Sequence, residues 1–207
     1  SLSFYLQIMK KNTNKATPVQ AAKGEVRIIA GLWRGRKLPV LNAVGLRPTG
    51  DRIKETLFNW LMPYIVNADC LDCFAGSGSL GFEALSRQAA QVTFLELDKS
   101  VAAQLNKNLQ TLQCSAQQAR VINQDSLQFL KQPQNRPHFD IVFVDPPFRF
   151  NLVEQTLSLL VQHNWLKEKA LIYVETEKDK KPLTPENWIL LKEKNSGQVS
   201  YRLYQAA

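Results

Sequence analysis

The chain has 207 residues, of which 44% are hydrophobic, and 26 lysines and arginines against 18 aspartates and glutamates give a net charge of +8. This composition is typical of a single globular domain with a small appendage and excludes a wholly disordered protein. No apolar run approaches the roughly 20 residues that a membrane helix needs, and three cysteines do not make a disulfide framework. We therefore expect a soluble cytoplasmic protein with no membrane partner.

The positive charge is concentrated at one end of the chain. Residues 1–60 contain 11 basic and 3 acidic residues, whereas residues 61–207 contain 15 of each and are neutral. Such asymmetry predicts a segment that binds a polyanion, attached to a neutral body. Residues 1–24 are polar and are expected to form a flexible tail, for which a merely solvated basic segment is an equal alternative. From Arg27 onward the charges alternate with apolar residues, glycines and Trp33, which predicts a folded basic face suited to RNA.

The pattern of apolar residues predicts a hairpin, then a helix, then alternating strands and helices. Residues 26–30 and 36–40 read as two short strands around a glycine-bounded turn. The next segment has helical spacing, begins near Thr49 or Asp51 as its cap, and ends at Pro63. Beyond it the predicted strands are 70–74, 92–96, 120–122, 140–144 and 170–174, and the predicted helices are 80–87, 100–112, 126–131 and 153–163.

Alternating strands and helices indicate an α/β fold with a Rossmann-like, mostly parallel sheet and helices on both faces. Residues 188–192 and 199–204 flank Asn195-Ser196-Gly197 and predict a C-terminal antiparallel hairpin on that sheet. The basic hairpin and helix then form a small N-terminal extension.

A glycine-rich loop follows the first strand of this sheet. Gly76, Gly78 and Gly81 have the G-x-G-x-x-G spacing, and Glu96 ends the next strand 20 residues after Gly76. Glycines let the backbone approach a ligand closely, and a carboxylate at that position accepts hydrogen bonds from the ribose hydroxyls of an adenosine. A loop that only packs the helix against the strand is the alternative. The pattern favours an adenosine cofactor.

Two adenosine cofactors fit this frame, and the charge of Asp72 distinguishes them. Asp72 immediately precedes the loop, where an anion opposes the pyrophosphate of NAD(P). S-adenosylmethionine carries an ammonium and a sulfonium, which an acidic pocket favours. Asp125 and Ser126, after the third strand, could reach the adenine amino group, although Asp125 is equally suited to be a helix N-cap.

The segment Asp145-Pro146-Pro147-Phe148 follows a strand of buried character. Two prolines make the turn rigid and remove backbone donors, so its carbonyls point outward as acceptors. The Asp145 carboxylate and the Pro146 carbonyl can each accept one hydrogen of an exocyclic amine, and Phe148 can stack on its base. The alternative is a tight strand-to-helix turn. The position, at the carboxyl end of a strand, is where ligands bind in open α/β sheets.

Several sequence motifs of this chain together resemble a known protein family. The segment from Asp145 to Phe148 resembles a motif of the amino-methyltransferases that use S-adenosylmethionine. Adenine-N6 enzymes share this motif. Arg27 to Gly31, Trp33 to Lys37, Arg47-Pro48-Thr49 and the stretch from Leu71 to Arg87 are similar to the bacterial guanine-N2 methyltransferases of small-subunit ribosomal RNA. The resemblance covers residues 25–205. One departure is Gln88, where the family more often has glycine, and there we expect a different helix cap.

The resemblance implies methyl transfer from S-adenosylmethionine to the N2 amine of a guanine in 16S ribosomal RNA, within an assembling small ribosomal subunit. It divides the chain into the tail at 1–24, an RNA-binding extension at 25–63 and a methyltransferase domain at 64–207, with no metal and as a monomer. The catalytic residues are then Asp145, Pro146, Pro147 and Phe148. The cofactor-binding residues are Asp72, Phe74, Ala75, Gly76, Ser77, Gly78, Glu96, Leu97, Asp125 and Ser126. The RNA-binding residues are Arg27, Trp33, Arg34, Arg36, Lys37, Arg47, Thr49 and Arg52.

Three other functions remain open at this point. The same motif permits adenine-N6 methylation of DNA or RNA. The glycine loop alone permits an NAD(P)-dependent oxidoreductase, in which Asp145 has no role. The fold with its basic segment permits a non-catalytic RNA-binding module in ribosome assembly. Two further features are expected to be structural: Cys70 and Cys73 should pack on opposite faces of a strand, and Trp60 should lie in the core.

Overall fold

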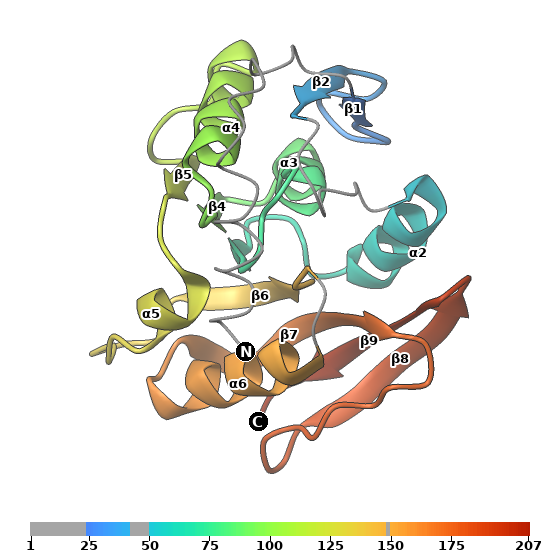
Figure 1. Ribbon diagram of the computed structural model, residues 1–207, viewed down its shortest axis with the longest axis vertical. Coiled ribbons are helices and arrows are strands. Elements are labelled where there is room, and N and C mark those ends of the chain that lie inside the picture. The colour runs from blue at the N-terminus through green and yellow to red at the C-terminus, as the bar shows by residue number, and fades with distance from the viewer. Residues whose placement is uncertain (1–23, 42–49, 148–149) are drawn as a thin grey trace, which may run out of the picture.

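The computed structural model describes residues 24–41, 50–147 and 150–207, and it contains one large sheet and one separate hairpin (Figure 1). The large sheet has seven strands in the order β5-β4-β3-β6-β7-β9-β8. Strands β3 to β7 run parallel, whereas β9 is antiparallel to both β7 and β8. The predicted Rossmann-like sheet with a C-terminal antiparallel hairpin is therefore confirmed.

The elements agree with the predicted order and differ from it mainly at their ends. The hairpin strands are β1 (Gly24–Arg27) and β2 (Lys37–Val40). The sheet strands are β3 (Asp69–Asp72), β4 (Gln91–Leu95), β5 (Ala119–Ile122), β6 (Phe139–Val144), β7 (Leu166–Glu177), β8 (Ile189–Ser196) and β9 (Val199–Gln205). The helices are α2 (Asp51–Leu61), α3 (Ser79–Ser86), α4 (Lys99–Thr111), α5 (Ser126–Leu130) and α6 (Phe150–Gln162). Gly50 caps α2 without a side-chain bond, so the expected cap at Asp51 is wrong, and Thr49 lies outside the described residues.

Two hydrophobic cores lie on the two faces of the sheet. Helices α2, α3 and α4 pack with the hairpin on one face, in a core that includes Ile28, Phe58 and Phe143. Helices α5 and α6 cover the other face, whose core includes Val142 and Trp165. Val142 and Phe143 are neighbours in β6 and belong to different cores because successive side chains of a strand point to opposite faces.

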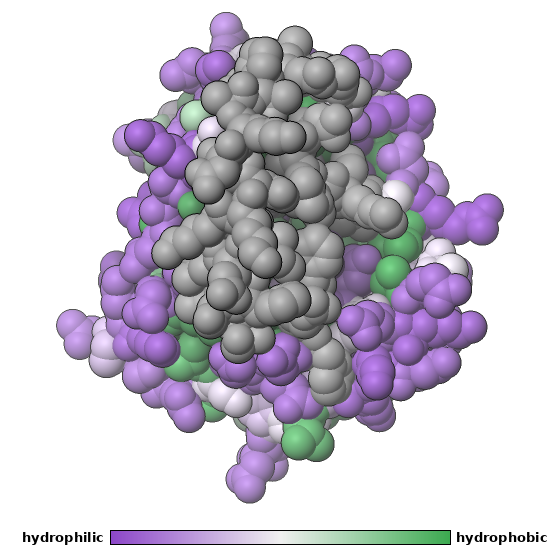
Figure 2. Space-filling view, in the orientation of Figure 1, coloured by the Kyte–Doolittle hydropathy of each residue, from purple (hydrophilic) through white to green (hydrophobic). Residues whose placement is uncertain are grey.

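The same alternation separates the two buried cysteines. Cys70 belongs to the first core and Cys73 to the second, as expected. Trp60 packs against the first core and stacks on Tyr201, with ring centroids 5.4 Å apart. On the face shown in Figure 2, the described surface is mostly hydrophilic, with hydrophobic residues in small separate groups. None of the described helices is long and apolar enough to span a membrane.

A buried carboxylate attaches the hairpin to the sheet domain. The Glu83 side chain on α3 is fully buried and accepts hydrogen bonds from the backbone N–H of Ile29, at 2.8 Å, and of Ala30, at 3.1 Å. Arg87 Nε donates to it at 2.9 Å, and Lys54 Nζ on α2 lies 3.5 Å away. One anion therefore holds the hairpin, α2 and α3 together, and its partners offset the cost of burying the charge.

The end of α3 corrects one expectation from the sequence. Gln88 follows the helix with a φ of 73°, a left-handed conformation that favours glycine. Its N–H donates to Leu85 O, and the N–H of Ala89 donates to Ala84 O, each at 3.0 Å. This pair of bonds is a Schellman motif. The chain thus keeps a glycine-type cap with glutamine in it, and the expected different cap is wrong.

Gln88→Gly should therefore stabilise the protein, since glycine adopts this conformation without the strain of a Cβ. We expect a gain of about 1 kcal/mol in the free energy of unfolding, measured by urea titration. Gln110→Gly is the matched control: Gln110 is an exposed residue inside α4, where glycine should cost about 1 kcal/mol instead. A destabilised Gln88→Gly variant would show that a contact of the Gln88 side chain stabilises the protein by more than the left-handed backbone conformation costs.

Candidate active site

The glycine loop connects β3 to α3, and each of its three glycines meets a specific constraint. Gly76 and Gly78 have φ values of 54° and 78°, which favour glycine. A Cβ on Gly78 would lie 2.4 Å from the Phe82 ring, and one on Gly81 would lie 2.2 Å from the Phe94 ring. The loop is therefore a tight turn at the start of α3, and Gly81 allows that helix to pack directly on β4.

Four carboxylates form a row at the carboxyl ends of four neighbouring strands. Each follows a core residue of the same face by two positions: Cys70 precedes Asp72, Phe94 precedes Glu96, Phe143 precedes Asp145 and Tyr173 precedes Glu175. Because side chains alternate along a strand, all four carboxylates emerge on the face that carries α2 and α3. Their strands β4, β3, β6 and β7 are consecutive in the sheet, so the row runs along one edge with a strand spacing of about 4.8 Å.

The row crosses the switch point of the sheet. From β3 the chain proceeds outward through β4 and β5, and it then returns to place β6 on the other side of β3. Ligands of open α/β sheets bind in the crevice at such a reversal, outside the carboxyl ends of the strands. Asp72 on β3 and Asp145 after β6 flank it. The structure thus brings together the glycine loop, Asp72, Glu96 and Asp145, as their positions in the sequence predicted.

The first half of the row contains two carboxyls, Asp72 and Glu96, whose pKa values are raised. Burial raises the pKa of Asp72 to about 7, opposed by a hydrogen bond from the Gly81 backbone and assisted by the charge of Glu96. Burial also raises the pKa of Glu96 to about 7, although backbone N–H groups that include Asp98 and Gly76 hydrogen-bond to it. Two carboxyls that hold protons near neutral pH define a site that favours a positively charged ligand.

The second half of the row contains Asp145 and Glu175. Burial raises the pKa of Asp145 well above its usual range, and the charges of Glu175 and Asp72 raise it further. Burial likewise raises the pKa of Glu175. Pro146 is buried behind Asp145 and Pro147 is partly buried, whereas Phe148 lies outside the described residues. Glu175 was not predicted from the sequence, because it neighbours Asp145 only through the pairing of β6 with β7.

The segment after β5 lies beside the glycine loop and the end of β4. Asp125 caps α5 and accepts a hydrogen bond from Gln128 N at 3.0 Å, which is the structural role considered for it. Ser126 Oγ donates to Cys73 O and so attaches α5 to the base of the glycine loop. Asn123 Nδ2 donates to Glu96 O at 2.8 Å and to Leu97 O at 2.9 Å. Phe74 and Leu97 are partly buried, whereas Ala75 and Ser77 are buried.

The predicted RNA-binding residues lie mainly on the hairpin and are exposed. Arg27 and Lys37 are paired across β1 and β2, and Arg34 and Arg36 lie in the turn between them. Arg27 Nε lies 3.8 Å from Asp51 and Lys37 Nζ lies 4.0 Å from Glu25, both exposed ion pairs of little strength. Arg52 is exposed on α2, and Trp33 is partly buried against the first core. Arg47 and Thr49 lie outside the described residues.

The hairpin adjoins the glycine loop. Asn108 on α4 donates to Pro39 O at 2.9 Å, and a small hollow between them is lined by Val40, Gly76 and Ser77. Lys54, which donates to Arg27 O at 2.6 Å, also donates to Ser79 Oγ at 3.1 Å, at the start of α3. The basic surface and the loop are thus held in one rigid arrangement.

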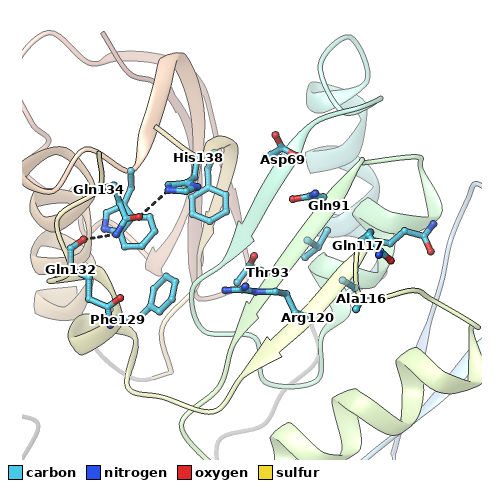
Figure 3. Close-up of a pocket in the computed structure, with 15 residues that line it drawn as sticks. Asp69, Gln91, Thr93, Ala116, Gln117, Arg120, Phe129, Gln132, Gln134 and His138 are labelled. Atoms are coloured by element: carbon cyan, nitrogen blue, oxygen red, sulfur yellow. Dashed lines mark hydrogen bonds between the residues drawn. The ribbon is translucent and has the colours of Figure 1, made fainter. Parts of the chain in front are cut away.

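A cavity of about 400 Å³ lies elsewhere, at the opposite ends of the strands (Figure 3). Asp69 and Gln91, the first residues of β3 and β4, line it, so it is separated from the carboxylate row by the length of those strands. His138 also lines it and hydrogen-bonds to Gln134 Oε1 at 2.9 Å (Figure 3). His138 is therefore distant from the row, in agreement with a non-catalytic histidine.

A family model, named relatives and solved structures are all similar to this chain over most of its length. The family model described as conserved hypothetical protein 95 matches residues 26–205. A Haemophilus influenzae protein named ribosomal RNA small subunit methyltransferase D is 79% identical, over 89% of this chain and 95% of its own. The solved structure of a putative methyltransferase from Escherichia coli is 57% identical with a TM-score of 0.81, over 88% of this chain and 98% of its own.

A more distant solved structure shares the fold alone. It is a Thermus thermophilus 16S rRNA N2 methyltransferase in complex with AdoMet and guanosine, 20% identical with a TM-score of 0.66. The match covers 93% of this chain and 52% of that protein. Its resemblance extends the fold assignment to methyltransferases with little sequence similarity to this chain.

The raised pKa of Asp72 predicts a stability cost that Asp72→Asn removes. Because the folded protein holds this proton up to about pH 7 and an unfolded aspartate loses it near pH 4, wild-type stability falls as pH rises between these values. Asp72→Asn should therefore be more stable than wild type at pH 8 by about 4 kcal/mol, with no difference near pH 4. Urea unfolding at both pH values measures this, with exposed Asp179→Asn as the control. Equal stability at pH 8 would contradict the electrostatic account.

Proposed function

This chain belongs to the ribosomal RNA small subunit methyltransferase D family, and we propose that it transfers a methyl group from S-adenosylmethionine to the N2 amine of a guanine in 16S ribosomal RNA. The observation that carries the proposal is the row of carboxylates across the switch point, with a cofactor half and a target half. The substrate is the small ribosomal subunit or its RNA, and the protein acts on it as a monomer in the cytoplasm.

The cofactor half fits S-adenosylmethionine by charge and shape. When bound, this cofactor supplies an electrophilic methyl group on a sulfonium. Burial raises the pKa of Asp72 and of Glu96 to about 7, so a ligand with an ammonium and a sulfonium would stabilise their charged forms. Glu96 would accept the ribose hydroxyls, and the backbone at Gly76 and Gly78 would admit the ligand closely. Ala75, Ser77, Phe74, Leu97, Asp125 and Ser126 would complete the walls.

The target half fits a base that carries an exocyclic amine. An Asp145 oxygen and the Pro146 carbonyl would each accept one amine hydrogen, which directs the nitrogen lone pair toward the methyl group. The guanine must leave its stack to enter, and Phe148 and Pro147 would pack on it. The nitrogen becomes acidic only after it is methylated, so the residues need to orient the amine rather than remove a proton first.

The hairpin supplies the affinity for RNA in this proposal. Arg27, Arg34, Arg36 and Lys37 share one exposed segment, with Arg52 on the adjoining helix. The strands of the hairpin end beside the glycine loop at Val40, whereas Arg34 and Arg36 lie in its turn, at the far ends of α3 and α4. RNA bound along the hairpin would therefore extend from this turn, where Trp33 lies, to the mouth of the site, where Arg47, Thr49 and Arg52 contribute. Residues 25–63 thus act as the RNA-binding extension and residues 64–207 as the methyltransferase domain.

Labelled methyl transfer tests the proposal directly. Small ribosomal subunits that lack the native modification would be incubated with labelled S-adenosylmethionine and the protein, and the RNA would be digested to nucleosides. We expect label in N2-methylguanosine with wild type, and a loss of at least about 100-fold with Asp145→Ala, because the amine loses its acceptor. Label in N6-methyladenosine would overturn the guanine assignment, and RNA binding without turnover would favour an assembly module.

The role of the hairpin predicts a change in salt dependence. Reversing two charges with Arg34→Glu and Arg36→Glu should weaken RNA binding and reduce the slope of log K against log salt by about 2, as two phosphate contacts are lost. The control is Lys192→Glu with Lys194→Glu, two exposed lysines on the edge strand β8. Equal slopes for wild type and the hairpin variant, measured by fluorescence anisotropy, would remove the hairpin from the RNA-binding surface.

A further inference from the structure

Glu175 and Asp145 lie side by side at the carboxyl ends of two parallel strands. The pairing of β6 with β7 ends with Val144 opposite Val174, and the next residues along each strand are the two carboxylates. The two side chains are in hydrogen-bonding contact. From the other side, the Tyr173 hydroxyl donates to Glu175 Oε2 at 2.9 Å. Glu175 is therefore held between a phenol that donates to it and a second carboxyl.

The surroundings of this pair contain acids and phenols. Asp72 faces Asp145 from β3, and Tyr201 on β9 faces Tyr173, with ring centroids 6.4 Å apart. Burial raises the pKa of both members of the pair, and the charges of Glu175 and Asp72 raise that of Asp145 further, whereas the hydrogen bonds of Glu175 with Tyr173 and Asp145 lower its pKa. Two buried carboxyls in contact favour a state in which they share one proton. A buried tyrosine that donates to the second carboxylate supports the acceptor role of Glu175.

We propose that Glu175 is a positioning residue for methyl transfer, which acts through Asp145 and is held in place by Tyr173. The proposal rests on the function proposed above. Because one Asp145 oxygen is engaged with Glu175, the carboxyl group cannot rotate freely, and its other oxygen is directed toward the crevice where the target amine would enter. This arrangement has the logic of a catalytic triad, in which a third group orients the residue that contacts the substrate.

The pair also provides a path for the proton that methyl transfer releases. The lone pair of the amine nitrogen forms a bond to the methyl carbon while the carbon–sulfur bond breaks. The electron pair of the broken bond stays on sulfur. The methylated nitrogen then loses a proton to the free oxygen of Asp145, while the proton already on Asp145 passes to Glu175. The pair thus gains one proton, the product amine becomes neutral, and the pair returns that proton to water after product release.

Glu175→Gln tests this proposal with two independent measurements. The first is the titration of the Asp145 carboxyl carbon by carbon-13 NMR, assigned by its loss in Asp145→Asn. Removing the neighbouring charge should move the Asp145 titration to lower pH in Glu175→Gln. The second is kinetics of methyl transfer, in which kcat should fall about 100-fold with little change in KM for cofactor or RNA. Tyr173→Phe should lower kcat less. Glu177→Gln, at the exposed end of the same strand, should change neither measurement.

The outcomes separate this proposal from the function on which it rests. An unchanged Asp145 titration in Glu175→Gln, or an unchanged kcat, overturns the positioning role. A fall in kcat that accompanies lost cofactor binding or unfolding also overturns it, since Glu175 would then be structural. If wild type itself transfers no methyl group to guanine, the proposed function fails, while the NMR titration still supports or overturns the link between Asp145 and Glu175.

Discussion

The burial of carboxylates along one edge of the sheet is the constraint on which the site depends. Asp72, Glu96, Asp145 and Glu175 share a face because each follows a buried core residue by two positions on four consecutive strands. Close packing of the core below fixes these strands, so the carboxyls cannot move apart, and burial keeps water from screening them. The folded protein therefore holds protons in the site near neutral pH. A cationic ligand would favour the charged carboxylates, so the proposed binding of the cofactor is coupled to the loss of those protons.

Glu83 shows the opposite use of a buried carboxylate. It is as deeply buried as any residue of the core, yet two backbone N–H groups, an arginine and a lysine surround it. Asp72 has a hydrogen bond from the Gly81 backbone but no cationic partner among the described residues, and its charge remains available to a ligand. The same short helix carries Glu83 and begins at the glycine loop, and Gly31 of the hairpin packs so tightly on it that a Cβ would lie 2.0 Å from Ser86 O. The basic hairpin and the cofactor loop are therefore attached to one rigid element.

Local patterns predicted the fold and most of the candidate site. The glycine loop, Asp72, Glu96 and Asp145 each stand at the end of a predicted strand, and parallel strands bring such positions to one edge. Glu175 was not predicted because it lies beside Asp145 only through the lateral pairing of β6 with β7. The usable signal in the sequence was a carboxylate two residues after Tyr173 on an apolar strand. Glu83 lies in an apolar helix with no motif, and its partners Ile29, Ala30 and Lys54 are distant in sequence. At Gln88, the rigid hydrogen bonds of the helix end outweighed the preference of the residue.

A crystal structure of the protein with S-adenosylmethionine and guanosine tests the central claim most directly. The account predicts the cofactor ribose on Glu96, its charged groups beside Asp72, and the guanine N2 amine within hydrogen-bonding distance of Asp145 and the Pro146 carbonyl. Both ligands would then lie along the one row of carboxylates, across the reversal between β3 and β6. A cofactor bound in the cavity near His138, or a guanine whose amine points away from Asp145, would contradict the account.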